Sequence, residues 1–153
     1  MVSMKKILLF GFLLVSFLGM SQEVKWLTLE EALVAQQKNP KPIFMDVYTT
    51  WCGPCKMLDK NTFVDPSVTA IINEKYYAVK FNAEGNGEVN FKGETYSNPG
   101  YDPNKKGRNS QHQFAQFLKV PGYPSMVIIS PEGEIKETIV GYHTPENLIA
   151  RIK

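Results

Sequence analysis

Short apolar runs bounded by turn residues mark the predicted strands of this chain. PIFMDVY (42–48) is one such run, and its near-continuous hydrophobicity is typical of a central strand buried on both faces of a sheet. Asp46 is the exception within it, an acid in an otherwise apolar strand. Further strands are predicted at YYAVKFN (76–82), PSMVIIS (124–130) and EIKETIVGY (134–142), and the turn PEGE (131–134) joins the last two as a hairpin.

Helix-start signals and helical spacing alternate with these strands. Thr28 and Glu31 form a capping box in TLEE, and Asp65-Pro66 offers an N-cap followed by a proline at the first helical position. Helices are predicted over 29–38, over the residues after Cys55, from 66 through 72, over 112–120 and from 145 to 152. The alternation predicts an α/β fold in which helices flank a mixed central sheet.

Residues 85–110 (GNGEVNFKGETYSNPGYDPNKKGRNS) do not fit this alternation. They contain five Gly, five Asn and two Pro, and a connection of this length in a compact domain is usually functional or mobile. We interpret the segment as an insertion loop. Val89, Phe91 and Tyr96 around Lys92-Gly93 also fit a small hairpin inside it.

The first 21 residues have the composition of a secretory signal peptide. The basic start MVSMKK precedes an apolar run of 14 residues (7–20), which is too short to span a bilayer comfortably. We predict cleavage after Ser21, one folded domain over 22–153, and an exported, for example periplasmic, location. The alternative is an uncleaved N-terminal membrane anchor.

The charge balance gives no indication of nucleic-acid binding. The chain has 17 basic and 15 acidic side chains, and removal of Lys5 and Lys6 with the signal peptide leaves 15 of each. No basic cluster or aromatic-basic stripe is present in the sequence, so we expect no nucleic-acid partner.

The only cysteines, Cys52 and Cys55, lie in WCGPCK (51–56). A structural disulfide between them would enclose four residues and stabilise the fold by roughly 2 kcal/mol, before strain is subtracted. A structural zinc site needs four ligands, and His112 and His143 are the only histidines, neither in ligand spacing with the cysteines. We interpret both histidines as surface or cap residues, and we predict no metal.

The motif has the features that thiol–disulfide exchange requires. If a helix begins at Gly53, Cys52 lies at its N-terminus, where free backbone N–H groups stabilise a thiolate. We expect Cys52 to lie near the surface and attack a partner disulfide, and Cys55, more buried, to resolve the mixed disulfide. Lys56 adds positive charge, and Trp51 offers a partly exposed apolar surface to an extended peptide.

Asp46 lies six residues before Cys52, on the strand that leads into the motif. It is therefore placed to lie beneath Cys55, where burial would raise its pKa and allow it to take the Cys55 proton. The alternative is a structural Asp46 satisfied by hydrogen bonds or by Lys80. Next to this motif we favour the catalytic role.

WCGPCK resembles the active site of the thioredoxin family. The resemblance implies a thioredoxin fold, in which Pro124 of GYPS is a cis-proline facing the disulfide and the 85–110 insertion precedes the helix before it. It also implies that Asp46 is the family's buried acid, that Lys80 on the next strand is its partner, and that Gly141 is the glycine near the end of the last strand. The implied substrate-binding residues are Trp51, Gly53, Pro54, Tyr123, Pro124 and Gly141, with the backbone of Tyr123 binding a partner.

A narrower resemblance is carried by KPIFMDVYTTWCGPCK and NTFVDPSV. Both segments are similar to the periplasmic C-terminal thioredoxin domain of the DsbD family of membrane transporters, and we expect a free-standing relative of that domain. Tyr123 and Tyr48 depart from the residues usual in thioredoxins, and the 85–110 segment has no counterpart in a minimal thioredoxin.

The resemblance implies a thiol:disulfide oxidoreductase that needs no cofactor and acts on protein thiols and disulfides. Gly-Pro between the cysteines is typical of reducing thioredoxins, so we predict a monomeric reductase supplied by a membrane electron donor of the DsbD type. One alternative is a disulfide oxidase or isomerase. The other is a peptide-binding, chaperone-like module with secondary redox activity.

Overall fold

The computed structural model describes residues 22–153, so the predicted signal peptide, its cleavage site and the alternative anchor lie outside the described residues. The helices are α1 (Leu29–Lys38), α2 (Gly53–Met57), the π-helix η1 (Leu58–Thr62), α3 (Pro66–Lys75), α4 (Gln113–Leu118) and α5 (Pro145–Ile152). The strands are β1 (Trp26–Leu27), β2 (Ile43–Tyr48), β3 (Tyr77–Asn82), β4 (Val89–Phe91), β5 (Glu94–Tyr96), β6 (Ser125–Ile129) and β7 (Ile135–Val140). No helix within 22–153 is long and apolar enough to cross a membrane.

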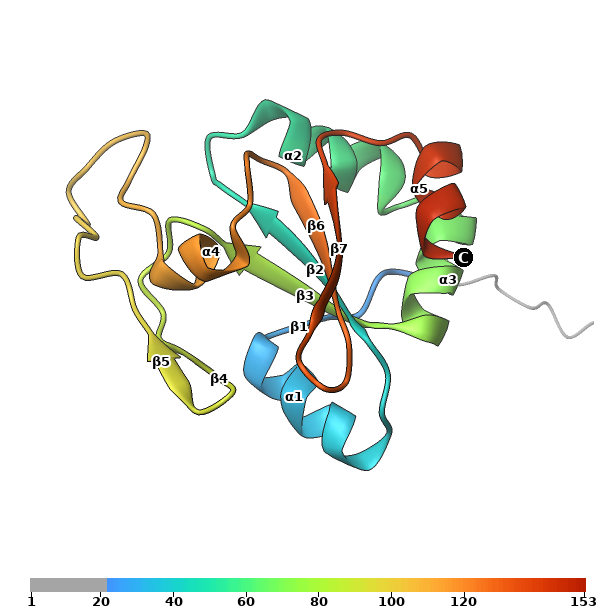
Figure 1. Ribbon diagram of the computed structural model, residues 1–153. Coiled ribbons are helices and arrows are strands. Elements are labelled where there is room, and N and C mark those ends of the chain that lie inside the picture. The colour runs from blue at the N-terminus through green and yellow to red at the C-terminus, as the bar shows by residue number, and fades with distance from the viewer. Residues whose placement is uncertain (1–21) are drawn as a thin grey trace, which may run out of the picture.

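A mixed five-stranded sheet with the order β1-β3-β2-β6-β7 forms the centre of the molecule (Figure 1). β1, β3 and β2 run parallel, whereas β6 pairs antiparallel with both β2 and β7. This arrangement confirms the predicted mixed sheet flanked by helices. The short edge strand β1 was not predicted, because two residues are too few to show a period of alternation.

Two apolar cores lie on opposite faces of the sheet. Ile43, Met45 and Val47 of β2 belong to the core that includes α1 and α4, whereas Phe44 belongs to the core that includes η1, α3 and α5. Successive side chains of a strand point to opposite faces, so Asp46 shares the face of Phe44. The α2–η1 segment covers this face directly above the end of β2 (Figure 1).

The insertion contains the predicted hairpin, in which β4 pairs antiparallel with β5. Phe91 is only 2% exposed and packs against Phe114 and Phe117 of α4, with ring centroids 5.4 and 5.8 Å apart. The hairpin is therefore part of the core that includes α1 and α4. The remainder of the insertion, from Ser97 to Ser110, forms no helix or strand.

One helix prediction needs correction. α4 is shorter than the predicted 112–120, because Lys119 adopts a left-handed conformation with φ of 54° and ends the helix. His112 caps α4 through its ring nitrogen, as the cap interpretation expected, but it is 1% exposed and so is not a surface residue. The predicted helix after Cys55 is present and changes to π-helical hydrogen bonding at Leu58.

Candidate active site

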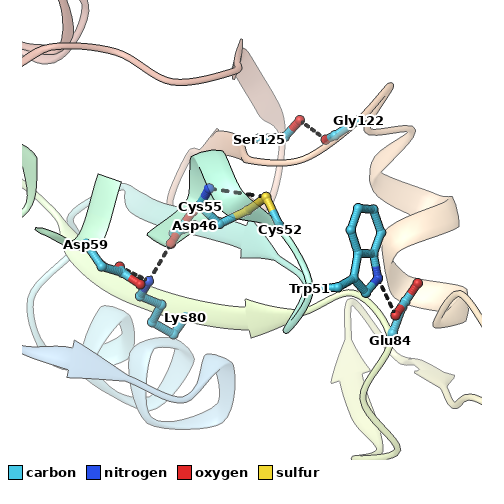
Figure 2. Close-up of a disulfide and its surroundings, with 9 residues drawn as sticks. All are labelled: Asp46, Trp51, Cys52, Cys55, Asp59, Lys80, Glu84, Gly122 and Ser125. Carbon is cyan, nitrogen blue, oxygen red and sulfur yellow. Dashed lines mark hydrogen bonds and ion pairs between the residues drawn. A yellow bond between two sulfur atoms is a disulfide. The ribbon is translucent and has the colours of Figure 1, made fainter. Parts of the chain in front are cut away.

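Cys52 and Cys55 form a disulfide at the start of α2, directly after the central strand β2 (Figure 2). Cys52 is the N-cap of α2, and its Sγ accepts a hydrogen bond from the backbone N–H of Cys55 at 3.2 Å. The Cys52 sulfur thus faces the free N–H groups of a helix start, which favour a thiolate when the disulfide is reduced. Pro54 fits here because a proline in the first helical turn loses no helical hydrogen bond.

Cys52 is not near the surface in this oxidised form, contrary to the expectation from sequence. Each cysteine is 2% exposed, and the two sulfurs are joined in the disulfide. Burial therefore does not distinguish the two thiols. The position at the helix start does, because Cys52 alone occupies the N-cap.

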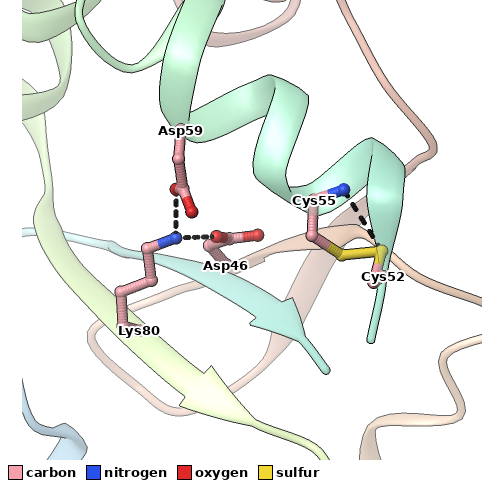
Figure 3. Close-up of polar contacts among 5 residues, drawn as sticks. All are labelled: Asp46, Cys52, Cys55, Asp59 and Lys80. Carbon is pink, nitrogen blue, oxygen red and sulfur yellow. Dashed lines mark hydrogen bonds and ion pairs between the residues drawn. A yellow bond between two sulfur atoms is a disulfide. The ribbon is translucent and has the colours of Figure 1, made fainter. Parts of the chain in front are cut away.

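Asp46 is completely buried and lies between the disulfide and Lys80 (Figure 3). Asp46 and Lys80 are directly paired in the register of β2 and β3, and Lys80 Nζ donates to Asp46 Oδ2 at 2.6 Å. The second oxygen, Oδ1, is buried and has no hydrogen-bond partner among the described residues. One carboxylate oxygen is therefore occupied by Lys80, and the other is available to accept a proton.

Burial raises the pKa of Asp46 from 3.8 to about 6, although the charge and hydrogen bond of Lys80 act in the opposite direction. Burial alone would lower the pKa of Lys80, but the carboxylates of Asp46 and Asp59 more than offset this and raise it. Lys80 therefore stays protonated at neutral pH, while Asp46 is a carboxylate of unusually high basicity. Such a group is suited to general-base catalysis near pH 7.

Asp59 was missed by the sequence analysis. It lies in the first turn of η1, pairs with Lys80 Nζ and is half exposed. Its position four residues after Cys55 places it one turn further along the same helical segment, and this spacing was the signal that could have found it. Asp46, Lys80 and Asp59 thus form a connected chain of charged groups from the buried carboxylate to solvent (Figure 3).

The Tyr123–Pro124 peptide bond is cis, as the resemblance implied, and Pro124 directly precedes β6. Gly141 N–H donates to the Pro124 carbonyl at 2.8 Å and holds the end of β7 next to this loop. The φ of Gly141 is +86°, a conformation that disfavours any residue with a Cβ. This conformation explains why glycine stands at position 141.

Trp51 and Tyr123 are in contact beside the disulfide, with ring centroids 6.1 Å apart in an edge-to-face arrangement. Trp51 is 36% exposed, so it is partly exposed as predicted. A Cβ added at Gly53 would meet no atom within 4 Å, so the surface next to Cys52 is open. Gly53 and Pro54 are both exposed at this surface.

Three further residues at this site carried no sequence signal. Trp51 Nε1 donates to Glu84 at 2.9 Å, the Arg108 guanidinium lies 4.3 Å from the centre of the Trp51 ring, and Gln111 donates to the Tyr123 hydroxyl at 3.0 Å. Arg108 lies near the end of the insertion, and Glu84 and Gln111 directly precede and follow it, so the fold brings both ends of the insertion to this surface. Within residues 22–153, no group of three or more His, Cys, Asp or Glu side chains is arranged to hold a metal ion.

Comparison with known proteins shows the family to which this chain belongs. A sequence profile described as the thioredoxin-like domain matches residues 29–153. The chain belongs to the thioredoxin-like family. This thioredoxin-like protein is a thiol:disulfide oxidoreductase, and its redox-active pair is Cys52–Cys55.

Individual relatives agree with this assignment. The thioredoxin-like protein is 26% identical over 120 residues to thiol:disulfide interchange protein DsbD 2 of Pseudomonas aeruginosa, a match that covers 78% of this chain and 16% of the relative. It therefore spans less than a fifth of the length of that protein. This sequence match supports the predicted resemblance to DsbD.

Two solved structures are also similar. A candidate disulphide isomerase from Bacteroides thetaiotaomicron is 26% identical with a TM-score of 0.58, covering 86% of this chain and 92% of that one. The reduced C-terminal domain of DsbD from Neisseria meningitidis is 19% identical with a TM-score of 0.55, covering 81% of this chain and 90% of that one. The second likeness supports the thioredoxin fold.

Proposed function

We propose that this protein reduces disulfides of other proteins in an exported compartment, with Cys52 as the attacking thiol and Cys55 as the resolving thiol. The observation that carries the proposal is the buried Asp46, which has one oxygen without a hydrogen-bond partner and lies beside the cysteine pair. A base in this position serves the step that releases a reduced client, because Cys55 must lose its proton before it can attack.

The reaction proceeds in two exchanges. The Cys52 thiolate attacks one sulfur of the client disulfide, a Cys52–client disulfide forms, and the second client sulfur leaves as a thiolate that takes a proton from water. Asp46 then accepts the proton of Cys55, and the Cys55 thiolate attacks Cys52 Sγ. The client leaves with both cysteines reduced, and two electrons have passed from the protein, which now holds the Cys52–Cys55 disulfide.

Repeated turnover requires a reductant for the Cys52–Cys55 disulfide. An exported compartment is oxidising, so reducing equivalents must cross the membrane. We propose a membrane donor of the DsbD type, on the basis of the sequence similarity to DsbD 2. The signal peptide predicted for residues 1–21 supports the exported location.

The reduction potential of the Cys52–Cys55 couple tests the direction of electron flow. We expect a value near the thioredoxin potential of about −270 mV when residues 22–153 are equilibrated with defined thiol–disulfide buffers. A value above about −180 mV would contradict a reductase and indicate an oxidase or isomerase.

An isomerase is the second candidate, favoured by the similarity to the candidate disulphide isomerase of Bacteroides thetaiotaomicron. Recovery of native activity from a scrambled, fully oxidised test protein distinguishes the two functions. A reductase converts the scrambled protein to thiols without restoring its activity, whereas an isomerase restores activity while the disulfides persist.

A further inference from the structure

The end of the insertion forms one side of the active-site surface. The guanidinium of Arg108 lies 4.3 Å from the centre of the Trp51 ring. The next residue, Asn109, donates its backbone N–H to Glu84 Oε2 at 3.0 Å, and the same oxygen accepts the Trp51 Nε1–H at 2.9 Å. Figure 2 shows this Trp51–Glu84 bond beside Cys52. Arg108 is thus held against the aromatic residue that directly precedes the redox pair.

The same segment also reaches Tyr123, the residue before the cis-proline. Gln111 Nε2 donates to the Tyr123 hydroxyl at 3.0 Å, and Tyr123 in turn contacts Trp51. Residues 108–111 therefore contact both aromatic side chains of the predicted substrate-binding surface.

Arg108 contributes a positive charge with unused hydrogen-bond donors. Its side chain is exposed, and within residues 22–153 it forms no ion pair within 4.0 Å and no hydrogen bond. Its guanidinium lies over the Trp51 ring, and its N–H groups remain available to another ligand. The carboxylate of Glu84, unlike the Arg108 guanidinium, is already engaged, because its Oε2 accepts two hydrogen bonds.

Two lysines close to Arg108 in the sequence carry the same charge as Arg108. Lys105 and Lys106 are exposed in the same loop. The acid of this stretch, Asp102, accepts the backbone N–H of Asn104 at 2.9 Å through Oδ1. Residues 97–110 thus carry three cations and one acid, and of these charged side chains Arg108 is the one that contacts Trp51.

We propose that Arg108 selects client proteins that carry a carboxylate side chain next to the disulfide to be reduced. The carboxylate receives paired N–H donors from the guanidinium while the client cysteine lies over Cys52, between Trp51 and Pro124. Arginine is suited to this task because its planar fork matches the two oxygens of a carboxylate and its face stacks on an aromatic ring. This inference rests on the proposed reductase function and names the substrate class of the same site.

Matched synthetic peptide disulfides test the proposal. Each is a symmetric disulfide of one short extended peptide, and the two versions differ only by Glu or Gln within two residues of the cysteine. The reduced protein is mixed with each peptide, and the second-order rate constant is measured from the change in tryptophan fluorescence. For the wild type we expect the Glu peptide to react about five to ten times faster than the Gln peptide at low salt, and we expect this ratio to decrease at high salt.

Two variants of Arg108 and one control show whether the preference for the Glu peptide depends on Arg108 itself. Arg108→Gln should bring the Glu/Gln rate ratio close to one, and Arg108→Glu should invert it, because the carboxylates then repel each other. Lys105→Glu changes the charge of the same loop by the same amount as Arg108→Glu. This control should retain a ratio well above one, because Arg108 is still present on Trp51.

Each remaining outcome has a definite meaning. Equal rates for both peptides with the wild-type protein would overturn the recognition role while leaving the reductase function intact. A ratio lost equally in Lys105→Glu and Arg108→Glu would contradict a contact by Arg108 and indicate only the overall charge of the loop. If neither peptide is reduced, nor the neutral compound hydroxyethyl disulfide, the proposed function itself fails.

Discussion

Asp46 is the residue whose environment most clearly departs from the rest of the core. A completely buried carboxylate with only one partnered oxygen opposes folding at neutral pH, because its charged form is poorly solvated. The same desolvation makes it a stronger base than a surface aspartate. The energetic cost and the chemical use of Asp46 thus have one physical cause.

Replacement Asp46→Asn should slow the resolution step at neutral pH. Asparagine keeps the shape and can accept the Lys80 hydrogen bond but cannot take the Cys55 proton, so we expect a loss of about 10²-fold. Rapid-mixing measurements of mixed-disulfide decay at pH 7 report this step. Asp59→Asn is the matched control, since it removes the exposed acid on Lys80 and leaves Asp46 in place. An unchanged rate in Asp46→Asn would make Asp46 purely structural.

Asp46 should also give stability a distinctive pH dependence. Its pKa is about 6 in the folded protein and 3.8 as the unperturbed value, so between these pH values the folded state binds more protons than the unfolded state. The contribution of Asp46 to the free energy of unfolding therefore falls as pH rises from about 4 to about 6. At pH 7 the loss is on the order of 3 kcal/mol relative to acidic pH.

Denaturant unfolding of the oxidised protein across this pH range measures the effect. Asp46→Asn lacks the titrating group, so its stability should lack this decrease and should exceed that of the wild type at pH 7 by up to the same amount. Parallel pH profiles for the two proteins would show that Asp46 does not titrate with a raised pKa.

At the scale of elements, the strands were predicted best where the sequence pattern and the packing agree. β2 is apolar because both of its faces are covered, and its one charged residue, Asp46, lies beside the cysteine pair. β1 was missed because its two residues pair with β3 through contacts distant in sequence. The change to a π-helix at Leu58 also leaves no pattern in side-chain type, because it concerns only backbone hydrogen bonds.

The composition of the insertion gives no indication that the β4–β5 hairpin contributes to the apolar core. Polar and glycine residues dominate the segment, but Phe91 packs against the stacked rings of Phe114 and Phe117 in α4. Phe91→Ala should therefore reduce the free energy of unfolding by about 3–5 kcal/mol, as expected for a buried aromatic residue.

Glu94→Ala provides the control for this variant. Glu94 is exposed and pairs with Phe91 across the hairpin, so its removal should change stability by no more than about 0.5 kcal/mol. Denaturant unfolding compares the two variants. Similar small effects would show that the hairpin does not contribute to the core.

At the scale of the whole molecule, the site is assembled from four distant parts of the chain. The sheet places β2 at its centre, so the Cys52–Cys55 motif that follows it lies beside the cis-proline loop before β6 and opposite Lys80 of β3. Motif spacing led to Cys52, Cys55 and Asp46, and the family resemblance led to Lys80 and Pro124. Glu84 and Arg108 could not be predicted, because their contacts with Trp51 depend on how the insertion folds back.

Chemical trapping tests most directly whether Cys52 is the attacking thiol. Cys55→Ser removes the resolving thiol, so after reaction with a client disulfide the protein should accumulate a mixed disulfide through Cys52, identified by mass spectrometry of the linked peptides. Cys52→Ser should accumulate little or none, because Cys55 lacks the N-cap position that favours the thiolate. A mixed disulfide that forms through Cys55 in Cys52→Ser at a comparable rate would contradict the assignment of the two cysteines.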